Sequence, residues 1–206
     1  AASDVYKRQS HRLVYNNEHN RIIQSIHTMS HKIFVFGDSF AADPIGWARM
    51  LKGEVSNFAE NGIGEYKIFK ALQTFLNFDK AVICHSSPWR VHARIHPVHK
   101  DNPTRYNNDF ILNDVEYHSK INKDMKVVNE YLKNYYDPEY QEDTYNLFLK
   151  QLMKIPNTIH ITFHDPEDTK QITHNFNHIW KQHPGDINHM SENGNKIIAE
   201  KIQELL

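Results

Sequence analysis

Short apolar runs alternate with helix-like stretches along most of the chain. The runs 32–36, 80–84 and 158–163 predict buried strands, because a parallel strand covered on both faces is continuously apolar. Residues 54–58 can form a further strand. Helical spacing or composition predicts helices over 45–51, 64–77, 119–135, 138–154 and 191–206. This alternation predicts an α/β fold, a three-layer α/β/α sandwich with a parallel sheet of about four to five strands.

The length of 206 residues favours one domain. We predict that residues 29–206 form it, with an insert at about 86–157 between the strands at 80–84 and 158–163. Residues 1–28 are polar, and residues 4–9 match the translated end of a common sequencing transposon. We therefore expect residues 1–28 to be a non-native or disordered leader and Met29 to be the natural start, the alternative being a genuine polar arm.

Composition excludes several classes of protein. Hydrophobic residues make up 39% of the chain and charged residues 24%, which is ordinary for a globular protein. The 24 basic and 25 acidic residues nearly balance, and this lack of a basic excess argues against a nucleic-acid or acidic-membrane partner. The one cysteine, Cys84, excludes an internal disulfide and a cysteine-based zinc site, and we expect it to be a small buried apolar residue. No apolar run reaches the roughly 20 residues of a membrane span. We expect a cytoplasmic protein without a cofactor.

Gly37-Asp38-Ser39 directly follows the first predicted strand. In open α/β sheets, ligands bind beyond the carboxyl ends of the strands, so the Ser39 hydroxyl can project into such a crevice. Gly37 permits a tight turn there. Backbone N–H groups at a following helix start can bind an oxyanion. The tripeptide alone is equally typical of a plain turn.

A second candidate motif, Asp186-Ile187-Asn188-His189, precedes the last predicted helix. A serine becomes a good nucleophile only when a base takes its proton, and the base must be held in one tautomer. An aspartate three residues before a histidine can orient that base. Alone, the motif is also typical of a solvated turn.

Together the two motifs resemble the SGNH, or GDSL, hydrolase family. The family's first block matches Gly37-Asp38-Ser39, and its last block matches Asp186 and His189, with 191–199 similar to the family's last helix. The resemblance spans about 29–206 and implies a flavodoxin-like sheet. It also implies a catalytic triad of Ser39, Asp186 and His189.

The resemblance implies an oxyanion hole built from the N–H groups of Ser39 and Gly62, with Gly64 as the competing glycine. The family's third block carries an asparagine that this chain lacks. Alignment by strand end places Ser87 there, and Arg90 or His85 are the other candidates to replace the missing donor. One lost oxyanion donor can cost about 2.7–4 kcal/mol of transition-state stabilisation, so the departure weakens the expectation of activity.

Further polar residues at the strand ends are candidate substrate-binding groups. We expect Asp38, His85, Trp89 and Arg90 to have this role, since aromatic and arginine side chains suit sugar rings or anionic substituents. A second possibility is a metal site, because the spacing of the histidines at 92, 96 and 99 can place them on one helical face. Pro97 interrupts that helix, so we expect a solvated or substrate-facing loop and no metal.

Two functions follow as expectations. The first is a serine esterase that removes acetyl or other short acyl groups from a carbohydrate or small molecule through an acyl-enzyme on Ser39, or passes the acyl group to another acceptor. The second is a non-catalytic, carbohydrate-binding or structural relative with an impaired oxyanion hole. The sequence leaves the oligomeric state and the acyl group open.

Overall fold

The computed structural model describes residues 32–75, 77–186 and 189–206. The predicted leader 1–28 and the start at Met29 lie outside these residues. The described part contains a five-stranded parallel sheet in the order β2-β1-β3-β4-β5, which is the flavodoxin-like strand order. The strands are β1 (Lys32–Gly37), β2 (Glu54–Asn57), β3 (Lys80–His85), β4 (Thr158–Thr162) and β5 (His174–Asn175). The predicted α/β class is therefore confirmed.

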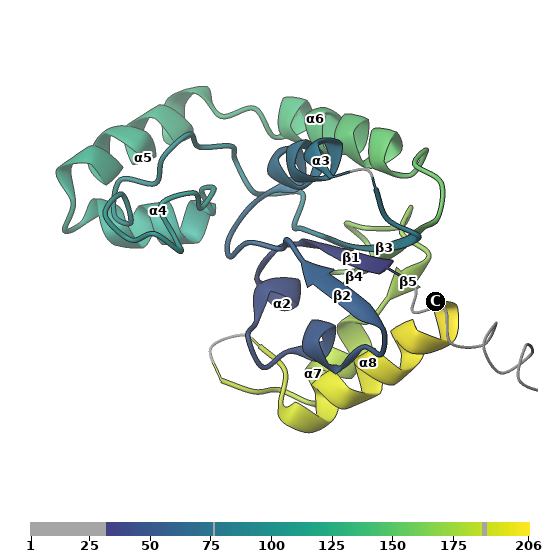
Figure 1. The fold of residues 1–206 in the computed structure, drawn as a ribbon. Coiled ribbons are helices and arrows are strands. Elements are labelled where there is room, and N and C mark those ends of the chain that lie inside the picture. Colours follow the sequence, from purple (N-terminus) through teal and green to yellow (C-terminus); the bar gives the residue numbers. More distant parts are fainter. Residues whose placement is uncertain (1–31, 76, 187–188) are drawn as a thin grey trace, which may run out of the picture. The chain divides into compact units, whose positions relative to one another are not determined.

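Helices cover both faces of the sheet, which gives three layers (Figure 1). Helices α3 (Glu65–Thr74) and α6 (Pro138–Leu152) lie on one face. The short 3₁₀ helix η1 (Trp47–Met50), α7 (Asn177–Gln182) and α8 (Glu192–Leu205) lie on the other, together with the single-turn helix α2 (Ser39–Ala42). None of the described helices is long and apolar enough to cross a membrane.

Alternation along β1 assigns its side chains to the two apolar cores. Ile33 and Val35 pack with the core under η1 and α8. Phe34 and Phe36 pack with the core under α3 and α6. Because successive side chains of a strand point to opposite faces, a continuous apolar run such as 33–36 requires cover on both sides.

The predicted insert at 86–157 contains three helices. α4 (Leu112–Ser119) and α5 (Lys123–Tyr135) pack on each other around a small apolar cluster centred on Val115, Met125 and Leu132. Sequence periodicity predicts one helix over 119–135. The structure instead ends α4 at Ser119 and starts α5 after Asn122. The Asn122 side chain accepts hydrogen bonds from the N–H groups of Asp124 and Met125. An N-cap of this kind fixes a new helix start.

Candidate functional site

A cavity of about 610 Å³ lies at the carboxyl edge of the sheet. Segments that follow β1, β2, β3 and β4 contribute to its wall, and so does the loop before α8. The lining includes Ser39, Gly62, Arg90, His164 and His189. The structure therefore gathers the predicted nucleophile, the predicted base and the predicted oxyanion glycine around one cavity.

The turn that carries Ser39 depends on close packing between β1 and β3. A Cβ at Gly37 would lie 2.6 Å from the Cβ of Cys84, so only glycine fits there. The next residue, Asp38, caps α2 by accepting a hydrogen bond from the Phe40 N–H at 3.1 Å. Ser39 then occupies the first position of α2 and is partly exposed to the cavity.

Asp38 was expected to bind substrate, but its side chain is fully buried. Its Oδ2 lies 3.5 Å from Nε2 of His164. Burial alone raises the pKa of Asp38, but His164, the Arg90 charge and the Phe40 N–H lower it more, so the pKa lies below its ordinary value. Asp38 is therefore a buried carboxylate that supports the turn beneath Ser39 and is not part of the cavity lining.

The predicted base, His189, is paired with an aspartate that the sequence motif did not indicate. Its Nδ1 lies 3.0 Å from Oδ2 of Asp43, which follows α2. The expected partner, Asp186, is exposed, and it contacts His189 through its main chain, its carbonyl accepting the His189 N–H at 3.1 Å. The carboxylate that contacts the His189 ring is thus that of Asp43, where the sequence motif predicts that of Asp186. Asp186 remains in the cavity lining.

Phe40 packs against two histidine rings at the cavity. It stacks on His189 with ring centroids 6.1 Å apart and meets His164 edge-on at 5.9 Å. Among the described residues, the Ser39 hydroxyl forms no hydrogen bond with either histidine. Catalytic hydrogen bonds are often long before substrate binds, so this arrangement is compatible with a base that engages Ser39 in the complex.

The predicted oxyanion glycine has a backbone that suits the role. Gly62 has φ +67, and a Cβ there would lie 2.6 Å from the Asn108 side chain. Within the described part of the chain, the N–H groups of Gly62 and Ser39 donate to no other residue. Both residues line the cavity, so these N–H groups are candidate donors to a ligand there. The competing glycine, Gly64, donates its N–H to Asp109 at 2.7 Å and does not line this cavity.

Ser87 and Trp89 do not line the cavity that Ser39 lines. The Ser87 Oγ accepts the Trp89 N–H at 3.3 Å, and Ser87 lines a separate, small pocket beside α6. The Trp89 ring donates to Asp168 at 3.2 Å. The expected roles of Ser87 in the oxyanion hole and of Trp89 in substrate binding therefore have no support from their positions. Of the predicted substrate-binding residues, Arg90 alone lines the cavity.

His85 was also expected in the crevice, but it belongs to a buried chain of hydrogen bonds. Its Nδ1 lies 2.6 Å from Glu65 and its Nε2 lies 2.8 Å from Nδ1 of His160. Nε2 of His160 lies 2.8 Å from the hydroxyl of Thr158, which in turn donates to the Ile155 carbonyl at 2.6 Å. His85 is fully buried, so it contacts no ligand in the cavity.

The donor and acceptor in each of these hydrogen bonds determine where the protons lie. Because the Thr158 hydroxyl donates to a carbonyl, it accepts from Nε2 of His160, and Nδ1 of His160 then accepts from His85. Burial, followed by the charges of His85 and His174, lowers the pKa of His160 to about 3, which agrees with a neutral ring. One proton therefore remains between Nδ1 of His85 and the carboxylate of Glu65.

The histidines that could have bound a metal lie in two groups. His92 lies 3.3 Å from Asp109, whereas His96 stacks on His99 and contacts His118. Across residues 32–206, with the gaps given above, no three His, Cys, Asp or Glu side chains are arranged to hold a metal ion.

Cys84 is buried, and burial followed by the charges of Asp38 and Glu65 raises the pKa of its thiol.

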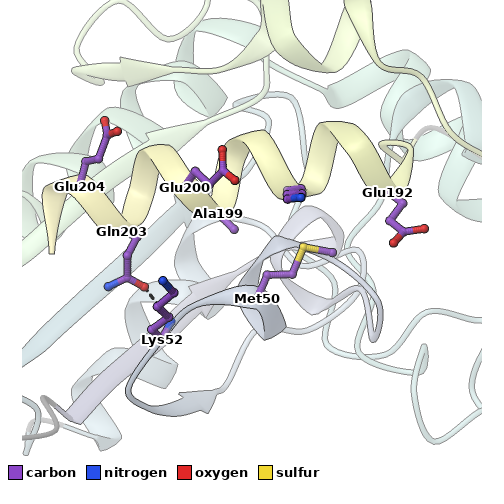
Figure 2. A pocket seen from close by; sticks show the side chains of 8 residues that line it. Met50, Lys52, Glu192, Ala199, Glu200, Gln203 and Glu204 are labelled. Atoms are coloured by element: carbon purple, nitrogen blue, oxygen red, sulfur yellow. Dashed lines mark hydrogen bonds between the residues drawn. The ribbon is translucent and has the colours of Figure 1, made fainter.

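A second groove lies between the η1 region and α8 (Figure 2). It measures about 560 Å³. Its wall combines lysine and glutamate side chains with Met50, Ala199 and Gln203, and the Gln203 side chain accepts the Lys52 N–H at 2.7 Å. The described residues that line it include no serine, cysteine or histidine.

Comparison with known proteins adds little to this picture. No protein-family model matches the chain, and no curated protein matches it. Among solved structures, the chain is similar to a protein from Streptococcus pneumonia provisionally described as a platelet activating factor. That similarity has 13% sequence identity and a TM-score of 0.37, over 96% of this chain and 98% of the other. A likeness at this level carries no argument about function.

Sequence reasoning missed Asp43 and His164, among other residues of the site. His164 could have been found, because it comes two residues after β4, at the carboxyl edge where the other site residues lie. Asp43 had no comparable signal, because its contact with His189 depends on how two distant loops fold.

Proposed function

We propose that this protein is a serine esterase that hydrolyses short acyl esters of a carbohydrate or another small molecule. The observation that carries the proposal is the common cavity lined by Ser39, Gly62 and His189, with Asp43 bonded to Nδ1 of the His189 ring. A nucleophile, a base with its orienting carboxylate and free backbone donors are the groups that acyl transfer requires.

In the proposed mechanism, the Ser39 oxygen attacks the ester carbonyl carbon while His189 takes the hydroxyl proton. The carbonyl oxygen becomes negative and is held by the N–H groups of Ser39 and Gly62. When the intermediate collapses, His189 returns the proton to the leaving alcohol. Water, deprotonated by His189, then attacks the acyl-enzyme and releases the acid.

Asp43 supports the base in two ways. Its carboxylate accepts the Nδ1–H of His189, which leaves Nε2 unprotonated and ready to accept the serine proton. It also stabilises the imidazolium that forms after transfer. The remaining carboxylate oxygen of Asp43 accepts the Ile45 N–H at 3.0 Å, so the acid is held in place.

A second candidate function is non-catalytic carbohydrate binding by the same cavity. The observation that favours it is the end of β3, where His85-Ser86-Ser87 replaces the asparagine block that the resemblance implies. A carbohydrate-binding protein would need the cavity, but it would not need residues that transfer protons.

Hydrolysis of neutral acetyl esters separates the two functions. The purified protein is assayed for hydrolysis of p-nitrophenyl acetate. It is also incubated with acetylated monosaccharides, and the released acetate is measured. We expect Ser39→Ala to remove the activity and Ser56→Ala, on β2, to retain it. Sugar binding by a folded protein without Ser39-dependent hydrolysis would support the binder and reject the esterase.

A further inference from the structure

The end of β3 does not offer the side-chain oxyanion donor that the resemblance implies. Two of the three expected replacements are engaged elsewhere, because Ser87 lies in another pocket and the His85 ring is buried against Glu65. Arg90 is the remaining replacement, because it lines the cavity with Ser39 and Gly62 as well as the small pocket that contains Ser87.

The Arg90 guanidinium is anchored at the oxyanion glycine. Its Nη1 donates to the Gly62 carbonyl at 3.1 Å. Its Nε–H is buried and has no acceptor within the described residues. The guanidinium also forms no ion pair with any described carboxylate. Arg90 is thus a charged donor on a residue that lines the cavity, and it has one N–H group without an acceptor. Charged donors of this kind form strong hydrogen bonds with negatively charged oxygens.

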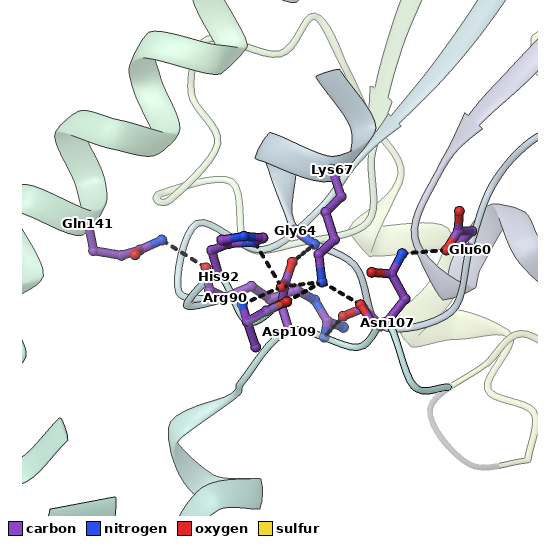
Figure 3. A network of polar contacts seen from close by, with 10 residues as sticks. Glu60, Gly64, Lys67, Arg90, His92, Asn107, Asp109 and Gln141 are labelled. Atoms are coloured by element: carbon purple, nitrogen blue, oxygen red, sulfur yellow. Dashed lines mark hydrogen bonds and ion pairs between the residues drawn. The ribbon is translucent and has the colours of Figure 1, made fainter. Parts of the chain in front are cut away.

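Hydrogen bonds hold the main chain at both partners of this contact, Arg90 and Gly62 (Figure 3). The Gln141 side chain, from α6, donates to the carbonyls of Pro88 and Arg90, both at 2.9 Å. Asp109 donates its N–H to the Gly62 carbonyl at 2.8 Å, while its carboxylate accepts the Gly64 N–H at 2.7 Å. Donors that are fixed before substrate binds need no rearrangement in the transition state.

We propose that Arg90 is a catalytic residue that donates a charged hydrogen bond to the oxyanion, in place of the missing asparagine. The inference rests on the proposed esterase function. Its chemistry is one of binding alone: the positive guanidinium stabilises the negative tetrahedral oxygen and exchanges no proton with it, because arginine stays protonated. A competing donor is the amide of Asn61, which lines the same cavity.

The test uses the full chain and p-nitrophenyl acetate, which carries no charged group for Arg90 to bind. We expect Arg90→Gln to lower kcat by about 10²–10³-fold with KM changed less than about threefold. We expect guanidinium ions to restore part of the kcat of Arg90→Ala, which a purely structural role would not predict. Arg94→Gln, an exposed arginine on the same loop, is the matched control and should retain wild-type kcat.

Circular dichroism establishes that each variant is folded at the assay temperature. The inference is overturned if folded Arg90→Gln keeps the wild-type kcat, if only KM changes, or if Asn61→Ala causes the loss instead. Failure of the proposed function gives a different result, because wild-type protein would then show no Ser39-dependent hydrolysis. That outcome rejects both the esterase and the role of Arg90.

Discussion

Asp43 and His189, separated by 146 positions in the chain, meet with their Oδ2 and Nδ1 atoms 3.0 Å apart. The contact joins the end of α2 to the loop before α8. It therefore ties the turn that carries Ser39 to the loop that carries His189. The two site segments support each other, although they lie near opposite ends of the described chain.

We predict that Asp43→Asn lowers the esterase kcat by about 10²-fold or more, the range associated with loss of acid–base assistance. The asparagine amide can donate to Nδ1 and so favours the tautomer in which Nε2 carries the proton and cannot accept one from Ser39. Steady-state kinetics on p-nitrophenyl acetate measure the effect. Circular dichroism shows whether the variant is folded.

Asp186→Asn separates the geometric assignment from the sequence motif. Because the Asp186 carboxylate does not contact the His189 ring, we predict a loss of kcat at least about tenfold smaller than that of Asp43→Asn. The opposite ranking would restore Asp186 as the orienting acid. Both variants remove one negative charge, so their comparison controls for a general electrostatic effect.

Acid should weaken the fold through buried histidines. Burial, with the charges of His99 and His118, lowers the pKa of His96 from 6.5 to about 4. Between these values the unfolded chain binds a proton that folded His96 does not, so the free energy of unfolding falls as pH falls. Urea unfolding at several pH values from about 7 to about 4 should show a shallower decline for His96→Phe than for wild type.

The control for this experiment is His178→Gln, which replaces an exposed histidine. It should leave the slope of unfolding free energy against pH unchanged. An equal slope in wild type and His96→Phe would show that His96 does not contribute. His96, His99 and His118 lie together, and His118 belongs to α4.

The buried chain that begins at Glu65 gives a prediction about stability. Glu65→Ala leaves Nδ1 of His85 without a partner in the core, and we predict a loss of about 1–3 kcal/mol in the free energy of unfolding. Glu65→Gln should lose less, since its amide can donate to the same nitrogen. Glu54→Gln, at an exposed position on β2, is the control. Urea denaturation measures all three, and equal values for Ala and Gln would contradict the hydrogen-bond account.

The fold was largely predictable because the apolar pattern specifies buried strands. The runs at 32–36 and 80–84 must be covered on both faces, and β1 and β3 confirm them as strands with one extra residue each. Helix α4 was missed, and so were the two-residue strand β5 and the short helices α2 and α7. Elements this short bury too few side chains to produce a period that can be recognised.

The site was predictable to the extent that it follows strand ends. That rule placed Ser39 and Gly62 correctly at the cavity, whereas it placed His85 there wrongly. Alternation along β3 explains the error, because His85 shares a face with Ala81 and Ile83, whose core lies under α3. Its ring therefore points beneath α3 and toward Glu65.

The most direct test of the central claim is covalent labelling of the native protein with a fluorophosphonate, followed by intact mass measurement and peptide mapping. An activated serine reacts with this probe, whereas an ordinary hydroxyl does not. The account predicts one label per chain on Ser39, lost in Ser39→Ala and greatly slowed in Asp43→Asn. A folded wild-type protein that takes up no label, or takes it up on another residue, would contradict the account.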